Sequence, residues 1–230
     1  MTITTIGFDA DDTLWHNEVF FKGTQARFAA LLADHADPDH LMDRLLAAER
    51  RNLGHYGFGI KGFTLSMIET AIEVTEGRVP ATVIAEILAD GREMLRHPVD
   101  LMPGVADCVE TLAADFTLVL ITKGDLLDQE RKLAESGLGE MFDGIEIVSD
   151  KTPSTYAQAF DVHGEGAHRS LMVGNSMKSD VVPAIDAGAW GVFCPSEHEW
   201  ELERAKEPAD HPRYRRIVTL ADLPPLLATL

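Results

Sequence analysis

The sequence is poor in cysteine and contains no long apolar run. Its two cysteines, Cys108 and Cys194, lie far apart and form no pairing pattern, so we expect buried, reduced thiols. There is no run of about 18 apolar residues, and no basic segment followed by an apolar stretch begins the chain. These absences predict neither a membrane span nor a secretory signal, and the expected location is the cytoplasm.

Positive charge is also scarce. The chain has 20 Lys and Arg residues against 38 Asp and Glu residues, which gives a net charge of −18. This charge disfavours binding to nucleic acid or to an anionic membrane, so we expect neither as a partner. It would also repel an anionic substrate unless cations are placed locally. The sequence carries no signal for an oligomeric state.

Outside one long segment, apolar runs alternate with stretches of helical spacing. Such β-α repeats predict an α/β fold, in which a doubly wound parallel sheet has helices on both faces. The expected strands cover residues 6–8, 116–121, 145–148, 170–173 and 191–194.

Residues 18–96 differ, because their apolar residues recur at helical spacing and no clear strand occurs among them. Asp37-Pro38 and Val79-Pro80 are plausible helix starts. We therefore predict an all-helical domain of residues 18–96, inserted into an α/β core of residues 1–17 and 97–230.

One connection in this helical domain mixes glycine with Tyr56, Phe58 and Lys61. It is either a flexible connector between helices or a loop that reaches over a ligand. In the second case, these three side chains would contribute to substrate specificity. His16 follows the first strand closely, where it either lines the cleft between core and insertion or belongs to a hinge.

Polar side chains follow four of the expected strands. Because the carboxyl ends of parallel strands lie at one edge of the sheet, ligands bind there. The side chains are Asp9 and Asp11 after the first strand, Thr122 and Lys123 after the second, Lys151 after the third, and Asn175 and Asp180 after the fourth. Acidic residues, a hydroxyl and lysines that converge at one edge indicate a metal and phosphoryl-transfer site.

These residue types suit the chemistry. A carboxylate can attack phosphorus and form an acyl phosphate, and a second carboxylate can protonate the leaving oxygen and later deprotonate water. A divalent ion would offset the repulsion between the carboxylates and the phosphate. Thr122, Lys151 and backbone N–H groups, including that of Lys123, would hold the remaining phosphate oxygens.

The pattern Asp9-x-Asp11-x-Thr13, followed by Thr122, Lys151 and Asn175…Asp180, resembles the four motifs of the haloacid-dehalogenase-like hydrolase superfamily. The resemblance implies a Rossmann-like core, and the helical insertion is similar to the C1 cap of its subfamily I. It also implies that Asp9 is the nucleophile and Asp11 the general acid/base.

The resemblance further implies a bound Mg²⁺, held by the Asp9 side chain, the Asp11 backbone carbonyl and the last motif. Oxygen ligands and phosphate favour this metal. Two residues depart from the family pattern. Asp12 stands where glycine is common, and Asn175 stands where the last motif often has its first aspartate. Either Asn175 or Asp180 would then be the direct ligand.

The sequence thus predicts a magnesium-dependent phosphatase that hydrolyses a small phosphorylated metabolite through an aspartyl-phosphate. A phosphomutase would use the same residues. Dehalogenases of the superfamily lack the second aspartate of the first motif, which is present here as Asp11. A receiver-like phospho-acceptor domain would combine similar side chains, but it is much shorter and has no helical insertion. A binding protein without catalysis is disfavoured, because no expected catalytic side chain is missing.

Overall fold

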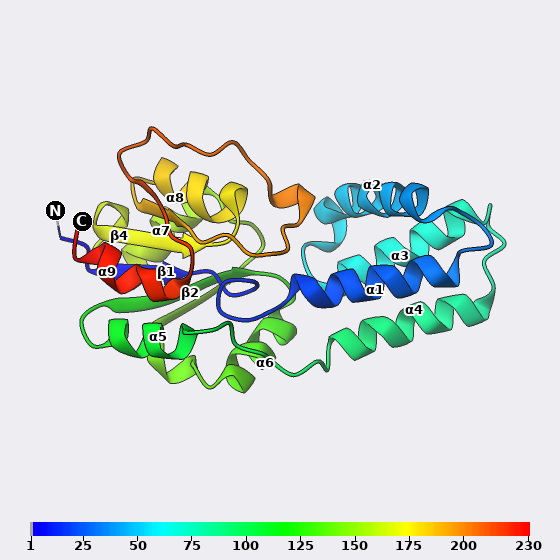
Figure 1. Cartoon of the computed structure of the whole chain (residues 1–230), viewed down its shortest axis with the longest axis horizontal. Coiled ribbons are helices and arrows are strands. Elements are labelled where there is room, and N and C mark those ends of the chain that lie inside the picture. Colours follow the sequence, from blue (N-terminus) through cyan, green and yellow to red (C-terminus); the bar gives the residue numbers. More distant parts are fainter. Residues whose placement is uncertain (1) are drawn as a thin grey trace. The chain divides into compact units, whose positions relative to one another are not determined.

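The computed structural model describes residues 2–230 and contains a six-stranded parallel sheet (Figure 1). The strand order is β3-β2-β1-β4-β5-β6, so the chain builds the sheet outward from β1 in both directions. The strands are β1 Thr5–Phe8, β2 Thr117–Lys123, β3 Gly144–Val148, β4 Ser170–Gly174, β5 Trp190–Phe193 and β6 Tyr214–Arg216. This order confirms the predicted doubly wound α/β fold and adds β6, which the sequence did not predict.

Helices cover both faces of the sheet because alternate residues of its buried strands are apolar on both sides. Leu118 and Leu120 of β2 pack in the cluster that contains α5 and α9, whereas Val119 and Ile121 pack against α7 and α8. The helices of this unit are α5 Val105–Ala113, α7 Pro153–His163, α8 Val182–Asp186, α9 Leu223–Leu227 and most of α6 Leu126–Ser136, which belongs to this unit from Gln129 onward.

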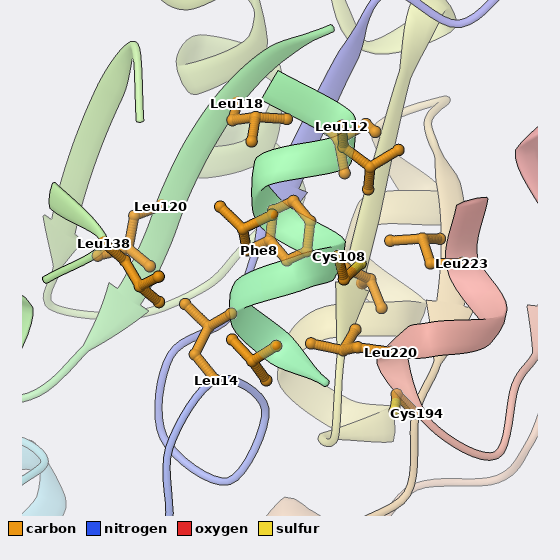
Figure 2. Packing of buried hydrophobic residues seen from close by; sticks show 14 of the residues in the cluster. Phe8, Leu14, Cys108, Leu112, Leu118, Leu120, Leu138, Cys194, Leu220 and Leu223 are labelled. Atoms are coloured by element: carbon orange, nitrogen blue, oxygen red, sulfur yellow. The ribbon is translucent and has the colours of Figure 1, made fainter. Parts of the chain in front are cut away.

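The larger cluster is centred on α5 (Figure 2). Phe8 of β1 lies beside Cys108 of α5, and Leu220 and Leu223 cover the side toward the C-terminus. Cys108 and Cys194 are both free and buried, as the sequence predicted. This apolar packing holds β1 rigidly, so the residues that follow β1 start from a fixed position.

The second compact unit is helical. It comprises Val19–Pro98 together with Gly124–Asp128, a short segment that the sequence assigned to the core. Its helices are α1 Glu18–Leu31, which begins one residue before the unit, α2 Pro38–Tyr56, α3 Ile60–Val74 and α4 Ala81–Met94. They share a separate apolar core that includes Phe28, Leu45 and Met67.

The two predicted helix starts match the observed starts of α2 and α4. Asp37 caps α2 by accepting a hydrogen bond from the His40 backbone N–H at 3.0 Å, and Pro38 is the first helical residue. Pro80 directly precedes α4. No helix within residues 2–230 is both long enough and apolar enough to cross a bilayer.

Candidate active site

The candidate site lies at the carboxyl ends of β1 and its two neighbours. Phe8, the last residue of β1, is in register with Leu120 of β2 and Val173 of β4. Asp9 continues this line, and its backbone N–H donates to the Val173 carbonyl at 3.0 Å. The sheet reverses its building direction between β1 and β4, which is the position where α/β sheets bind ligands.

Lys151 joins the two carboxylates that follow these strands. Its Nζ lies 2.5 Å from Asp9 Oδ1 and 2.6 Å from Asp180 Oδ1, and all three side chains are buried. Burial and the neighbouring Asp180 raise the pKa of Asp9, and Lys151 opposes that shift. Burial alone would lower the pKa of Lys151, but the two carboxylates outweigh it and raise that pKa above its usual range. The lysine therefore separates two buried negative charges that would otherwise repel each other.

Thr13 binds the second oxygen of the Asp9 carboxylate and so helps to orient it. The Thr13 hydroxyl donates to Asp9 Oδ2 at 3.1 Å and accepts from the Asn175 backbone N–H at 3.1 Å. Asp9 is thus held by Lys151 on one oxygen and by Thr13 on the other. The motif includes Thr13, but its position in the sequence indicates no role in the site.

Asp11 lies two residues beyond Asp9, and its carboxylate is also held on both oxygens. Trp15 Nε1 and Lys132 Nζ donate to Oδ1 at 2.7 and 2.9 Å. Gln129 Nε2 donates to Oδ2 at 2.8 Å. Gln129 and Lys132 were not predicted, because both lie in the middle of a helix and no strand end marks them.

Asp12 explains one departure from the family pattern. Its φ of 59° lies in the left-handed region that favours glycine, and aspartate is among the few other residues that tolerate it. Its carboxylate accepts hydrogen bonds from the Asn17 and Glu18 backbone N–H groups, where α1 begins. Burial raises the pKa of Asp12 to about 7. The aspartate therefore occupies a glycine-like turn and also fixes the start of α1.

Asn175 and Asp180 follow β4 in a segment that begins with a π-helical turn, Met177–Val181. α8 continues this turn from Val182. Asp180 Oδ2 accepts the Ser176 backbone N–H at 2.8 Å, and Oδ1 binds Lys151. Both oxygens of Asp180 thus have protein partners.

The oxygen atoms around Asn175 fit a hard cation. The end of its side chain lies 3.1 Å from Asp9 Oδ2 and 3.2 Å from the Asp11 backbone carbonyl oxygen. With the amide nitrogen on this side, Asn175 donates to both oxygens. With the amide oxygen there, a carboxylate, a carbonyl and an amide oxygen converge, which is the donor set that Mg²⁺ prefers. Within residues 2–230, no group of three or more His, Cys, Asp or Glu side chains is arranged to hold a metal. A cation at this position would therefore depend on the neutral oxygens as well.

The Lys123 amine is bound by Ser179, in the segment that follows β4, and by Glu203. Its Nζ donates to Ser179 Oγ at 2.7 Å and to Glu203 Oε1 at 2.8 Å, and Ser176 Oγ donates to Glu203 Oε2 at 2.5 Å. Burial would raise the pKa of Glu203, but Lys123 and the serine hydroxyls outweigh it and lower that pKa. Glu203 was missed because it lies in a charged segment far along the chain.

The two proposed phosphate-binding residues of β2 remain predictions. Thr122 is buried at the end of the strand, and its hydroxyl makes a long hydrogen bond of 3.3 Å to the Lys123 carbonyl. Glu203 holds the Lys123 amine, so the prediction that Lys123 contacts a phosphate concerns its backbone N–H.

The weaker specificity candidates are placed as follows. Lys61 lies in the helical unit, where its Nζ is 3.3 Å from Asp125 Oδ1 and its backbone N–H donates to Asp125 Oδ2. Tyr56 is exposed at the end of α2, and Phe58 is partly buried in the turn that follows. His16 lies in the core unit, and its backbone N–H donates to the Asp100 carbonyl. Their roles in specificity stay predictions.

Comparisons with solved structures place this fold among hydrolases. A haloacid dehalogenase-like family hydrolase from Xanthomonas campestris is 43% identical, with a TM-score of 0.89 over 99% of this chain and 91% of that chain. The magnesium-bound HAD-hydrolase YfnB from Bacillus subtilis is 18% identical, with a TM-score of 0.68 over 99% of each chain. L-2-haloacid dehalogenase from Xanthobacter autotrophicus is 20% identical, with a TM-score of 0.69 over the full length of both chains. The last two likenesses show the fold alone.

A comparison with curated proteins gave no match. The family model of the haloacid dehalogenase-like hydrolases matches residues 3–188, which include every strand-end residue of the site. Because this match covers most of the sequence and agrees with the order of the four motifs, the chain belongs to the haloacid dehalogenase-like hydrolases.

Proposed function

We propose that this hydrolase is a magnesium-dependent phosphatase that acts on a small phosphorylated metabolite through an aspartyl-phosphate. The observation that carries the proposal is the second carboxylate, Asp11, placed two residues beyond the buried Asp9. An alkoxide is a poor leaving group and needs a proton from a general acid, whereas a halide leaves without one. A carboxylate at Asp11 therefore favours phosphate esters over haloacids.

The proposed reaction has two steps. In the first, an Asp9 oxygen attacks phosphorus, the bond from phosphorus to the ester oxygen breaks, and Asp11 gives its proton to that oxygen. In the second, Asp11 takes a proton from water, the water oxygen attacks phosphorus, and the bond to Asp9 breaks to release inorganic phosphate. Lys151 supplies positive charge beside the transferred group. The Thr122 hydroxyl and the Lys123 backbone N–H donate hydrogen bonds to the phosphate oxygens.

The metal would be held by the Asp9 side chain, the Asp11 backbone carbonyl and the Asn175 amide oxygen. Asn175 is favoured over Asp180 as the direct ligand, because the end of its side chain lies 3.1 Å from Asp9 Oδ2 and 3.2 Å from the Asp11 carbonyl oxygen, the other two groups proposed to hold the metal. Bound Mg²⁺ would supply positive charge that offsets the repulsion between Asp9 and a phosphate dianion.

The test is a substrate screen on the purified protein. We expect inorganic phosphate to be released from one or more phosphorylated metabolites in the presence of Mg²⁺, and excess chelator to stop the release. The same panel includes 2-haloacids, with halide release as the readout. Asp9→Asn is the inactive control, and the exposed Asp115→Asn is the matched control that keeps activity. Halide release without phosphate release would replace this proposal with a dehalogenase, and transfer of phosphate within the substrate would replace it with a mutase.

A further inference from the structure

Three donors hold the Asp11 carboxylate, and they come from two parts of the core. Trp15 belongs to the segment that follows β1, whereas Gln129 and Lys132 lie three residues apart on α6. All three donors are at least nine-tenths buried, with exposed fractions of 1%, 2% and 7%. The Asp11 side chain itself is a quarter exposed. A partly exposed carboxylate is thus hydrogen-bonded by three buried donors.

Each donor is fixed by a second contact of its own. Gln129 Nε2 also donates to the Lys123 carbonyl at 3.0 Å, at the end of β2. Lys132 Nζ also donates to Asn17 Oδ1 at 2.9 Å. The Trp15 ring is packed in the main apolar cluster of the core. The three N–H donors therefore cannot move far, and they set the direction of both Asp11 oxygens.

A buried lysine is costly unless it serves a purpose that an apolar residue would not. Taking Lys132 and Asp11 out of water costs free energy that their attraction only partly returns, so such a pair is weak evidence for stability. The pair can, however, fix the orientation of the Asp11 carboxylate. A general acid or base that is misplaced by about 1 Å loses much of its effect on rate. The position of the lysine, against the carboxylate next to the nucleophile, suits orientation.

We propose that Lys132 and Gln129 are positioning residues, which hold the Asp11 carboxylate in the direction from which it exchanges protons with the leaving group and with water. The proposal rests on the phosphatase function proposed above. Neither side chain needs to contact the substrate, because both act through Asp11. Trp15 completes the set by donating to Oδ1 from the segment that follows β1.

Leaving-group dependence tests this role. Gln129→Met keeps the length of the side chain, Lys132→Met shortens it by one atom, and both substitutions remove the donor. We expect each to slow hydrolysis of phenyl phosphate by about tenfold or more, and that of p-nitrophenyl phosphate by less than about threefold, because nitrophenolate leaves with little help from an acid. Arg131→Met, on the same helix but paired with Glu135, should change neither rate.

A double-mutant cycle separates positioning from a general loss of structure. If Lys132 acts through Asp11, then Asp11→Asn combined with Lys132→Met should be no slower on phenyl phosphate than Asp11→Asn alone, within about twofold. Additive losses, or equal losses on both aryl phosphates, would overturn the proposal. A faster Lys132→Met enzyme would also overturn it, since the contact would then restrain Asp11 away from its working position.

The Trp15 indole N–H resonance gives a readout that does not depend on activity. In a ¹H–¹⁵N spectrum, assigned with Trp15→Phe, this resonance should shift in Asp11→Asn and in Lys132→Met and stay in place in Arg131→Met. If the wild-type protein hydrolyses neither the aryl phosphates nor any phosphorylated metabolite of the panel, the proposed function fails, and the indole shift still decides whether Lys132 orients Asp11. An unmoved resonance in Lys132→Met would refute the positioning role.

Discussion

Lys151 is the residue on which the buried carboxylates depend. Its amine contacts both Asp9 and Asp180, and the side chains of Lys151 and Asp180 are each only 1% exposed. Removing one partner of a buried ion pair leaves uncompensated charge in a medium of low polarity, which is far more costly than losing a surface pair. The same contact places positive charge beside the proposed nucleophile, so stability and activity share one side chain.

We expect Lys151→Met to lower the free energy of unfolding by about 3–5 kcal/mol, because Asp9 and Asp180 would face each other unpaired. Urea denaturation measures the change. Adding Asp180→Asn to this variant should recover part of the loss, since one of the two charges is then gone. Lys178→Met is the control, because its amine contacts only a carbonyl, that of Leu202, among the contacts seen for it. A Lys151→Met protein as stable as the wild type would show that the carboxylates do not need the lysine.

Asp11 should distinguish substrates by their leaving groups. Asp11→Asn removes the proton donor, so we expect hydrolysis of alkyl phosphates to fall by about 10²–10⁴-fold. Hydrolysis of p-nitrophenyl phosphate should fall by less than about tenfold, because its leaving group needs little protonation. Steady-state kinetics on both substrates decides the point. Equal losses on both substrates would show that Asp11 does not act as the general acid.

Strand ends explain which of these residues could be predicted. Asp9, Lys151 and Asp180 each follow an apolar run, and parallel strands must bring their carboxyl ends together, so their meeting could be expected from the sequence. Lys132 and Glu203 reach the site from a helix and from a late loop. Their contacts, of Lys132 with Asp11 and of Glu203 with Lys123, are set by tertiary packing, which no local pattern in the sequence predicts.

At the scale of elements, apolar runs predicted the buried strands but not β6. Tyr214–Arg216 has two arginines and lies at the edge of the sheet, where one side of a strand has no partner. Its arginines pack over aromatic rings of β5, with Arg215 over Trp190 at 4.7 Å and Arg216 over Phe193 at 5.1 Å. Cation–π contacts of this kind replace the apolar pattern on which strand prediction depends.

The turn between α2 and α3 depends on Gly59. Its φ of 116° is strained for any other residue, and a Cβ there would lie 2.8 Å from Asp125 Oδ2. We expect Gly59→Ala to destabilise the helical unit by about 1–3 kcal/mol, measured by thermal unfolding. Gly54→Ala is the matched control, because a Cβ at Gly54 meets nothing within 4 Å and alanine favours the helix. Equal effects of the two substitutions would show that the turn tolerates a side chain.

At the scale of the whole molecule, the chain forms two units with separate cores. The catalytic groups proposed here all belong to the core unit, whereas Tyr56, Phe58 and Lys61 belong to the helical one. This division suggests that chemistry and substrate choice are encoded separately. It also explains why the motifs predict a reaction class and not a substrate, since the helical unit carries no motif of its own.

Substitutions in the helical unit should therefore change substrate preference more than chemistry. We expect Tyr56→Ala, Phe58→Ala and Lys61→Met to reorder the kcat/KM values across a panel of phosphorylated metabolites. Turnover of p-nitrophenyl phosphate should change little, because it makes few contacts beyond the phosphate. Arg78→Met, at an exposed basic residue of the same unit, is the control. An unchanged ranking would make the turn after α2 a simple connector.

The net charge of −18 leads to a prediction about salt. A phosphate dianion approaches a molecule of its own sign, and the cations of the site, Lys151, Lys123 and Lys132, are all bound to carboxylates. The Debye length falls from about 30 Å at 0.01 M salt to about 8 Å at 0.15 M, which screens the distant acidic surface more than the contacts within the site. We therefore expect kcat/KM for a phosphate monoester to rise severalfold over this range, with kcat nearly constant, because only the approach of the substrate is affected. A fall in kcat/KM with salt would show instead that the bound metal and the lysines dominate the field that the substrate meets.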